Sequence, residues 1–561
     1  MTPGLAGFVV ASDEMTWDSA LDEALEALRG AFEVVLDQGS TPGGTRRTWF
    51  DTFDWRLYRA GLSLEYVATR RAGELVVTGT DGNRAVAGPA SSWRATRSYH
   101  ASDLPDGPAT RRIAGLIAPR ALLPMVTVST AGTVARLLNA DGKTVARVLV
   151  ERPAVEDRPL PPRLAVGEVR GYPAQARRAA RLISLAPGIE PASAEGAANC
   201  LLKDALRAIG RRPGDYSNKV DAKITADMAA PKAVATILLA LLDALEANVD
   251  GVLRDTDTEF LHDLRVAVRR TRAAIKLIGD ALGLPDQEYD RFAAEFKWLG
   301  DQTTPVRDLD VHLLDFDVMA SRLRAAKEDD LVPFRTFLQG RRAREFRALS
   351  RCLRSQRFTA LATQWRAVLD DVADNSNKSE ARGGAAVRER GGAAGRGRRV
   401  TGGERMPTAG RLAVGRTRQA FRKVTRRGGA ITADSPPESL HDLRKRCKEL
   451  RYVLEFFAPL HDKAAYSTVI GDLKKLQDCL GDFQDNEVQI EEIRALADAM
   501  LRAGPVFNGA AVPAGTLLAM GELTAGLAAS QQAARAAFEA RFASFAGPQA
   551  QGHMAVLLEA R

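Results

Sequence analysis

Two short segments place a histidine and a series of cations at the same spacing. Leu261-His262-Asp263-Leu264-Arg265 returns as Leu440-His441-Asp442-Leu443-Arg444. Further cations follow each copy at matching offsets, namely Arg269 and Arg272 after the first and Lys448 and Arg451 after the second. Guanidinium and ammonium groups bind phosphate oxygens well, so the repeated pattern predicts an anion-binding surface.

Both segments have the periodicity of an amphipathic helix. At about 100° per residue, the first row of polar side chains falls within an arc of about 80°. This row is His262, Arg265, Arg269, Arg272 and Lys276, and the second is His441, Arg444, Lys448 and Arg451. Glu455 takes the place of Lys276 in the second copy. Apolar residues occupy the adjoining face, so each helix can bury one side and hold its cations beside the core.

Two alternatives stand beside the anion site. Each row could be a solvated face stabilised by acids at i,i+4, but few acids are nearby and the cations within a row repel one another. The histidines could bind phosphate or serve helix packing. Neither His262 nor His441 has a second metal ligand on its own face, so no metal and no cofactor is expected.

The similarity continues downstream, which indicates a duplicated domain. Trp298-Leu299-Gly300-Asp301 with Arg307-Asp308 corresponds to Lys475-Leu476-Gln477-Asp478 with Gln484-Asp485. Arg307 either pairs with Asp308 or reaches the ligand. Additional candidates for the same cavity are Arg307, Arg347, Arg422 and Lys475.

The elements that must position these residues fall into two classes. Short alternating runs from about Arg47 to Val169 predict strands, Asn139-Ala140-Asp141-Gly142 predicts a hairpin turn, and the β-branched alternation has disappeared after about residue 195. Helical periodicity dominates afterwards. We therefore expect an α+β multidomain protein, with an antiparallel β-barrel or tunnel at 1–195, a linker at 196–229 and an all-α duplicated helical bundle at 230–545. The bundle halves are about 230–372 and 411–545, and the Gly- and Arg-rich segment 375–410 is predicted to be a disordered insertion.

Composition limits the possible functions. The chain of 561 residues has a net charge of +9 and is 27% charged, which fits a folded protein with an anionic partner. Its four cysteines show no CxxC spacing, so neither a zinc site nor a disulfide framework is indicated. No membrane span and no signal peptide are recognised, which predicts a cytoplasmic protein.

At these motifs the sequence resembles the CHAD family, the conserved histidine α-helical domain, over about residues 230–545. The matching segments are His262-Asp263-Leu264-Arg265-Val266, Val306-Arg307-Asp308-Leu309-Asp310-Val311 and His441-Asp442-Leu443-Arg444-Lys445. The resemblance implies two four-helix units around a basic cavity that binds polyphosphate, often at polyphosphate granules. The Arg-rich insertion is not part of the family's pattern.

The N-terminal region more weakly resembles the CYTH family of triphosphate-handling β-tunnels. Phe50-Asp51-Thr52, Gly61-Leu62 and Arg170-Gly171-Tyr172 are similar to its motifs. However, no Glu-x-Glu-x-Lys occurs near residue 8, and Glu65 and Val67 stand where paired arginines are expected. The acidic and basic residues needed for metal-assisted hydrolysis are therefore missing, and a degenerate CYTH-like domain is expected.

The prediction from sequence is noncatalytic binding of inorganic polyphosphate, or a similar polyanion, in a basic cavity between two helical halves. A granule-associated scaffold or regulator is one role that fits. The alternatives are a metal-dependent CYTH-type triphosphatase and nonspecific nucleic-acid binding through the Arg-rich insertion.

Overall fold

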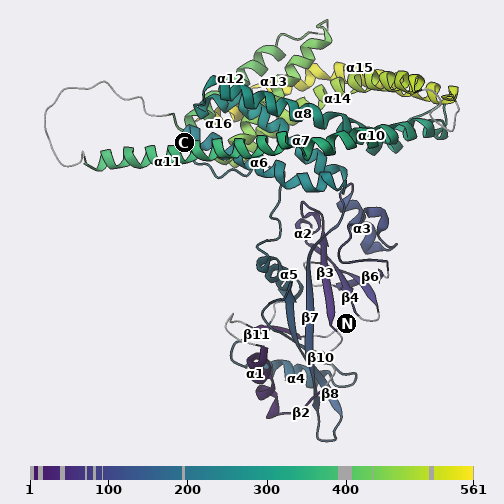
Figure 1. The fold of residues 1–561 in the computed structure, drawn as a ribbon, viewed down its shortest axis with the longest axis vertical. Helices are drawn as coiled ribbons and strands as arrows, with labels where there is room; N and C mark the ends of the chain where they lie inside the picture. Colours follow the sequence, from purple (N-terminus) through teal and green to yellow (C-terminus); the bar gives the residue numbers. More distant parts are fainter. Residues whose placement is uncertain are drawn as a thin grey trace. The chain divides into compact units, whose positions relative to one another are not determined.

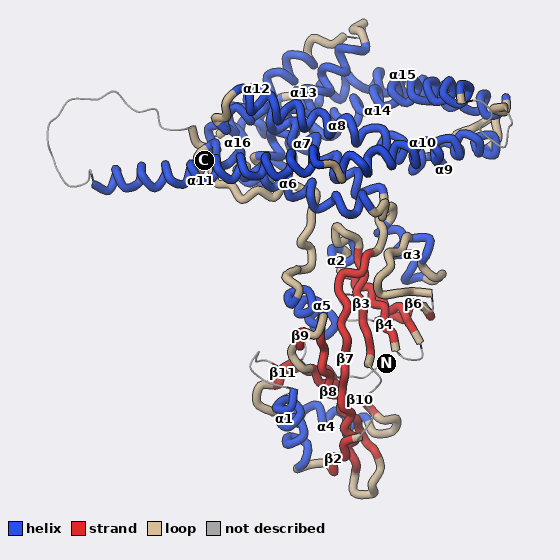
Figure 2. The backbone as a smooth tube through the Cα atoms, in the orientation of Figure 1, coloured by secondary structure: helices blue, strands red, loops and turns tan. Residues whose placement is uncertain are grey.

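The computed structural model divides into two compact units, Met1–Ser217 and Asn218–Arg561 (Figure 1). It describes residues 6–10, 17–37, 44–69, 72–79, 84–90, 92–191, 196–389, 407–432, 434–503 and 511–559. The first unit is built on a sheet and the second on helices, as Figure 2 shows by colour. The α+β class predicted from sequence is confirmed.

The first unit contains one antiparallel sheet, with its described strands in the order β11-β1-β10-β8-β7-β3-β4-β5-β6. The strands are β1 (Ala6–Val10), β2 (Glu33–Leu36), β3 (Thr45–Asp51), β4 (Leu62–Ala68), β5 (Gly73–Gly79), β6 (Arg84–Pro89), β7 (Leu123–Leu138), β8 (Thr144–Val155), β9 (Arg158–Pro159), β10 (Arg163–Glu168) and β11 (Ile189–Pro191). β2 pairs with β7, and β9 with β8. Among the described strands no pairing joins β6 to β11, so the sheet is open along this path rather than closed as a barrel.

The predicted hairpin turn is confirmed between β7 and β8. The Asn139 side-chain oxygen accepts hydrogen bonds from the backbone N–H of Asp141 (3.2 Å) and of Lys143 (2.9 Å). Gly142 has φ 71°, a left-handed conformation that costs glycine little. The turn therefore sets the register of the two strands at the centre of the sheet.

Five helices accompany the described part of this sheet: α1 (Trp17–Arg29), α2 (Arg56–Arg59), α3 (Pro108–Ile117), α4 (Pro173–Ile183) and α5 (Gly196–Ala208). Leu201 and Leu206 of α5 are buried in one cluster with Trp49 and Val126 of the sheet. The structure thus differs from the expected linker at 196–229. The apolar face of α5 covers part of the sheet, and the boundary between units falls after Ser217.

The second unit is helical throughout its described elements. They are α6 (Ala230–Leu253), α7 (Thr258–Ile278), α8 (Asp286–Leu314), α9 (Phe316–Ala320), α10 (Val332–Leu353), α11 (Gln356–Glu389), α12 (Ala409–Gly428), α13 (Pro437–Phe456), α14 (Lys463–Arg502), α15 (Ala514–Ala546) and α16 (Pro548–Leu558), with the short 3-10 turns η2 (Gly279–Leu282), η3 (Glu328–Leu331) and η5 (Ala458–Leu460). In the first half α6 packs on α7, α7 on α8 and α8 on α10. In the second half α12 packs on α13, α13 on α14 and α14 on α15, which repeats the same order.

Two boundaries of the helical unit differ from those expected. α16 lies beyond residue 545 and buries Met554 and Leu557 in the core of the second half. α11 continues to Glu389 and so includes the first part of the segment 375–410 that we expected to be disordered. That part contains alanine, lysine, glutamate and arginine, which favour helix and offset its glycines. Residues 390–406 of the predicted insertion lie outside the described residues.

The helix with the first row of cations is held in place at its N-terminus. The Asp257 side chain caps α7 by accepting hydrogen bonds from the backbone N–H of Glu259 (2.9 Å) and Phe260 (3.2 Å). Phe260 then packs against α6 at Gly251, where a Cβ would lie 2.2 Å from the ring. The missing side chain thus allows α6 and α7 to approach closely.

Gly251→Ala is expected to destabilise the helical unit by about 1–3 kcal/mol, because the added methyl overlaps the Phe260 ring. Gly340→Ala is the matched control, since it lies on the exposed face of α10 and a Cβ there meets nothing within 4 Å. The control should stabilise by up to about 1 kcal/mol through helix propensity. Urea unfolding measures both free energies, and a shift in the same direction for both variants would contradict the packing explanation.

Candidate anion-binding site

A cavity of about 750 Å³ lies among α7, α8, α13 and α14. Its cationic lining residues are Arg265, Arg269, Arg272, Arg307, Arg444 and Lys448, and its acidic ones are Asp308, Asp315, Asp485 and Glu492. A second cavity of about 340 Å³ shares Arg269, Arg444, Lys448 and Asp485 with the first. The two cavities are therefore adjoining parts of one groove, which we call the central groove. Cations from both copies of the repeat line it.

Two ion pairs between α7 and α13 align the rows. Arg270 bonds Glu455 at 3.0 Å, with both side chains about 15% exposed, and Lys276 bonds Glu449 at 2.7 Å. The copies are offset by 440 − 261 = 179 residues, so Arg270 corresponds to Glu449 and Lys276 to Glu455. Arg270 thus contacts the residue that corresponds to Lys276, and Lys276 contacts the residue that corresponds to Arg270. This reciprocal pairing is the contact pattern of a two-fold interface.

Acidic neighbours neutralise only some of the groove's cations. Arg444 bonds Asp485 at 2.7 Å, Arg451 bonds Glu455 at 2.7 Å, and Arg307 lies 3.7 Å from Glu259. Among the described residues, Arg269, Arg272 and Lys448 form no ion pair. These three come from both halves of the duplication and lie where a bound anion would complete their coordination.

Burial affects two cations of the groove, Lys448 and Arg265. Burial, reinforced by Arg444 and Arg269, lowers the pKa of Lys448 from 10.5 to about 8. Burial also lowers the pKa of Arg265, whose guanidinium donates to the hydroxyl of Thr304. A partly desolvated charge interacts more strongly with an opposite charge than a solvated one does. A phosphate in the groove would therefore stabilise the charged form of Lys448.

The wall opposite α7 is shaped by a small-residue segment of α8. Gly300 lies under the Arg272 guanidinium, which would be 2.9 Å from a Cβ at this position. The hydroxyls of Thr303 and Thr304 both donate to the Gly300 carbonyl oxygen, at 2.9 and 2.8 Å. The segment thus leaves space for arginine side chains above it and presents hydroxyl oxygens toward Arg265.

A known domain family and two solved structures are similar to part of this chain. Residues 236–494 match the family model of the CHAD domain. The chain contains a CHAD domain. The CHAD domain from the plant Ricinus communis is similar in structure, with 23% identity, a TM-score of 0.44, and coverage of 58% of this chain and 95% of that chain. PptA from Streptomyces chartreusis is similar at 17% identity and a TM-score of 0.38, covering 56% of this chain and 99% of that chain. A search of curated proteins finds no match.

The two histidines of the CHAD domain have different surroundings. His262 lines the central groove, as expected. His441 lines neither part of it, because its Nδ1 bonds the Gln484 side-chain oxygen and the Gln484 amide donates to Glu487 at 3.0 Å. Gln484 stands where the first copy has Arg307. The two histidines are therefore not equivalent, and the hydrogen bond of His441 fits the helix-packing alternative, since it joins α13 to α14.

Four further candidates lie away from the groove. Lys276 pairs with Glu449 and Lys475 with Asp472 at 3.1 Å, so both serve ion pairs. Arg347 is exposed on α10, and Arg422 lines a separate surface hollow on α12. The remaining predicted residues, Arg265, Arg269, Arg272, Arg307, Arg444, Lys448 and Arg451, all line the central groove. Helical spacing predicted which cations share a helix face but not which neighbour that face meets.

Sequence reasoning missed several polar residues of the groove. Thr303, Thr304 and His312 line it, and His312 is buried and bonds Glu492 at 2.9 Å. Arg270 lines the smaller part of the groove and pairs across the two halves. The offset of 179 residues would have shown that Arg270 and Lys276 each correspond to a glutamate, which is the signal for complementary pairing.

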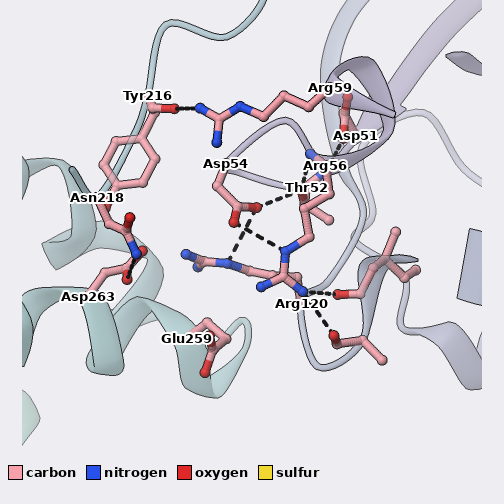
Figure 3. A network of polar contacts seen from close by, with 12 residues as sticks. Asp51, Thr52, Asp54, Arg56, Arg59, Arg120, Tyr216, Asn218, Glu259 and Asp263 are labelled. Carbon is pink, nitrogen blue, oxygen red and sulfur yellow. Dashed lines mark hydrogen bonds and ion pairs between the residues drawn. The ribbon is translucent and has the colours of Figure 1, made fainter. Parts of the chain in front are cut away.

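The motif Phe50-Asp51-Thr52 of the first unit forms a structural turn. The Asp51 carboxylate accepts hydrogen bonds from the backbone N–H of Thr52 (2.7 Å), Leu57 (2.9 Å) and Tyr58 (2.8 Å). Burial raises its pKa to about 6. Figure 3 shows Asp54 between Arg56, at 3.2 Å, and Arg120, at 3.6 Å. These carboxylates are engaged in holding the α2 turn.

Two absences concern the described part of the chain alone. There, no helix has the length and apolar character needed to span a membrane. Within the same residues, no three or more His, Cys, Asp or Glu side chains are arranged to hold a metal ion.

Lys448→Met is expected to stabilise the ligand-free protein at pH 7, because it removes a partly buried charge. The expected gain is about 1 kcal/mol, which is less than the full pKa shift implies, since the charge is still partly solvated. The folded pKa of about 8 lies below the unfolded value of 10.5, so the cost is fully present below pH 8. Stability of the wild type rises between these two pKa values, and the variant's advantage shrinks there. Urea unfolding at pH 7 and pH 10 measures the difference.

Lys445→Met on the same helix is the control, since Lys445 is exposed. It should leave the unfolding free energy nearly unchanged at both pH values. An equal gain from the two substitutions would show that added apolar area, rather than relief of a buried charge, is responsible.

Proposed function

We propose that the CHAD domain binds inorganic polyphosphate, or a similar linear polyanion, in the central groove without performing chemistry on it. A noncatalytic scaffold or regulator of polyphosphate, associated with polyphosphate granules, is the role that fits such binding. The protein would then bind a polymer that the cell makes elsewhere.

The observation that supports the proposal is the group of unpaired cations shared by the two halves. Arg269 and Arg272 come from α7, and Lys448 comes from α13. Holding like charges together at the groove is unfavourable without a counterion, most of all for Lys448, which is partly buried. A polymer with a negative charge on each repeating unit would satisfy several of these cations at once and release their counterions.

The shape of the groove favours a linear ligand over a single phosphate. Arg270 and Arg451 line the smaller part alone, and Arg265 and Arg307 line the larger part alone. Arg269, Arg444 and Lys448 line both parts. A chain of phosphates can contact successive cations along this path, whereas an isolated phosphate would contact one cluster.

The alternatives have weaker support. A CYTH-type triphosphatase needs opposed carboxylates free to hold a metal, and Asp51 and Asp54 are already hydrogen-bonded within a turn. Residues 390–406 of the expected Arg-rich insertion, which carries the nucleic-acid alternative, lie outside the described residues. Metal-dependent phosphate release by the full chain would support the enzyme, and it is assayed beside binding.

Arg269→Ala with Lys448→Ala is expected to weaken polyphosphate binding by about 100-fold near physiological salt, at roughly tenfold for each charge-assisted hydrogen bond removed. The slope of log affinity against log salt should also become shallower by about 0.7 for each phosphate that the variant no longer neutralises. Isothermal titration calorimetry over a salt series measures both quantities.

The charge-matched control is Arg344→Ala with Arg347→Ala, because both arginines are exposed on α10 and neither lines the groove. This variant should bind within about twofold of the wild type, since distant charges are screened. An equal decrease in affinity in the control, or wild-type affinity in the groove variant, would remove the site from consideration.

His262→Ala should weaken polyphosphate binding several-fold, whereas His441→Ala should leave the affinity nearly unchanged. The reason is that His262 lines the groove and His441 bonds Gln484. His441→Ala should instead lower the unfolding free energy by about 1 kcal/mol, because it removes this hydrogen bond. Binding and thermal unfolding are measured on both variants, and equal affinities would refute the asymmetry.

A further inference from the structure

α12 has a strongly basic surface that is separate from the central groove. A hollow of about 550 Å³ on this helix is lined by Gly415, Arg418, Gln419, Arg422, Lys423, Thr425 and Arg426. It contains four cations and no acidic residue. The central groove, in contrast, has carboxylates among its cations, such as Asp308 and Asp485. The hollow on α12 is therefore the more uniformly positive of the two.

The cations of this hollow have no partners among the described residues. Two other arginines of the helix do have them, since Arg416 pairs with Asp280 and Arg427 with Asp442. Arg418, Arg422, Lys423 and Arg426 form no ion pair within the described chain. Arg418, Arg422 and Arg426 are spaced at i,i+4, about 6 Å apart along the helix axis, and repel one another. Pairing thus anchors the helix at Arg416 and Arg427, while the row between them keeps its charge.

The opposite face of α12 packs in the core. Ala413, Thr417, Ala420 and Val424 are buried, and α12 packs along α13. Phe421, the one aromatic residue of the helix, packs against the core cluster and contacts Phe545 at a ring distance of 6.0 Å. The basic hollow therefore offers charge without an aromatic platform for stacking bases, which favours a ligand made of phosphates alone.

We infer that the basic hollow on α12 is a second polyphosphate-binding site, which engages long chains whose one end occupies the central groove. This inference rests on the proposed function of that groove. α13 connects the two sites, since it carries Arg444 and Lys448 in the groove and supports α12 on another face. A chain that reaches both sites gains affinity from the second contact without a second encounter, whereas a short chain occupies only one.

The test compares chains of about 10 and about 100 phosphates, because only the longer chain is expected to reach both sites. The full-length variant Arg418→Ala/Arg422→Ala/Arg426→Ala should bind the long chain about tenfold more weakly than the wild type and the short chain within about twofold. Fluorescence anisotropy at constant salt measures the four affinities. A longer polymer binds more tightly simply because it offers more positions at which the protein can bind. Comparing each variant with the wild type on polyphosphate of the same length cancels this effect.

The control is Arg344→Ala/Arg347→Ala/Arg351→Ala, three exposed arginines of α10 with the same change in net charge. It should affect both chain lengths equally and by no more than about twofold, since distant charges are screened. A decrease in long-chain affinity equal to that of the α12 variant would mean that net charge alone is responsible and would overturn the inference. Unchanged long-chain affinity in the α12 variant would also overturn it.

Two further arms separate this inference from the proposed function. If the wild type binds neither chain, the proposed function fails and the second site fails with it. If the groove variant Arg269→Ala/Lys448→Ala no longer binds the short chain while the α12 variant keeps the long one, the groove stands and only the second site is refuted. Loss of single-stranded DNA binding by the α12 variant, with polyphosphate binding unchanged, would make the hollow a nucleic-acid surface and overturn the inference.

Discussion

The contact between α7 and α13 is the constraint on which the helical unit depends. Two ion pairs cross this contact, Arg270–Glu455 and Lys276–Glu449, and in both the cation belongs to α7 and the glutamate to α13. A mostly buried pair such as Arg270–Glu455 is costly to break, because the surviving charge would lack a partner. Slipping one helix along the other would break both pairs together. The pairs therefore set the register that brings Arg269 of one copy close to Lys448 of the other.

Divergence of the two copies explains why the halves fit each other. The first copy has cations at 270 and 276, and the second has glutamates at the corresponding positions 449 and 455. Two identical first copies would oppose like charges across the same contact. A duplicated chain with complementary charges thus favours pairing between unlike halves. The two halves of the site are therefore not symmetric. Gln484 stands where the first copy has Arg307, and it bonds His441.

Charge and stability oppose each other at the groove. Lys448 keeps a charge in a half-buried place where burial and neighbouring arginines lower its pKa. The apolar clusters on either side supply the stability that offsets this cost, with Leu443, Cys447 and Leu450 of α13 fully buried. In the first unit the pattern is reversed. Asp51 and Asp54 are satisfied by hydrogen bonds and ion pairs within the turn, so these charges serve the fold.

Local patterns along the chain were enough to predict the class of each unit, the duplication and most of the groove. Period-2 runs predicted the sheet, the repeat predicted two cation-bearing helices, and seven of the predicted cations do line the groove. Periodicity along one helix or strand defines which side chains share a face, so these features need no knowledge of distant contacts. The family match confirmed the helical part of this prediction.

Only the tertiary structure showed which residue each cation contacts. Lys276 and Lys475 carry the same charge as Lys448, yet they pair with Glu449 and Asp472. Likewise, His441 matches His262 in sequence but bonds Gln484 of another helix. A partner distant in the chain has no signature in local spacing, and ion pairs form where packing brings two helices together. The role of each charge therefore depends on contacts that a helical pattern does not contain.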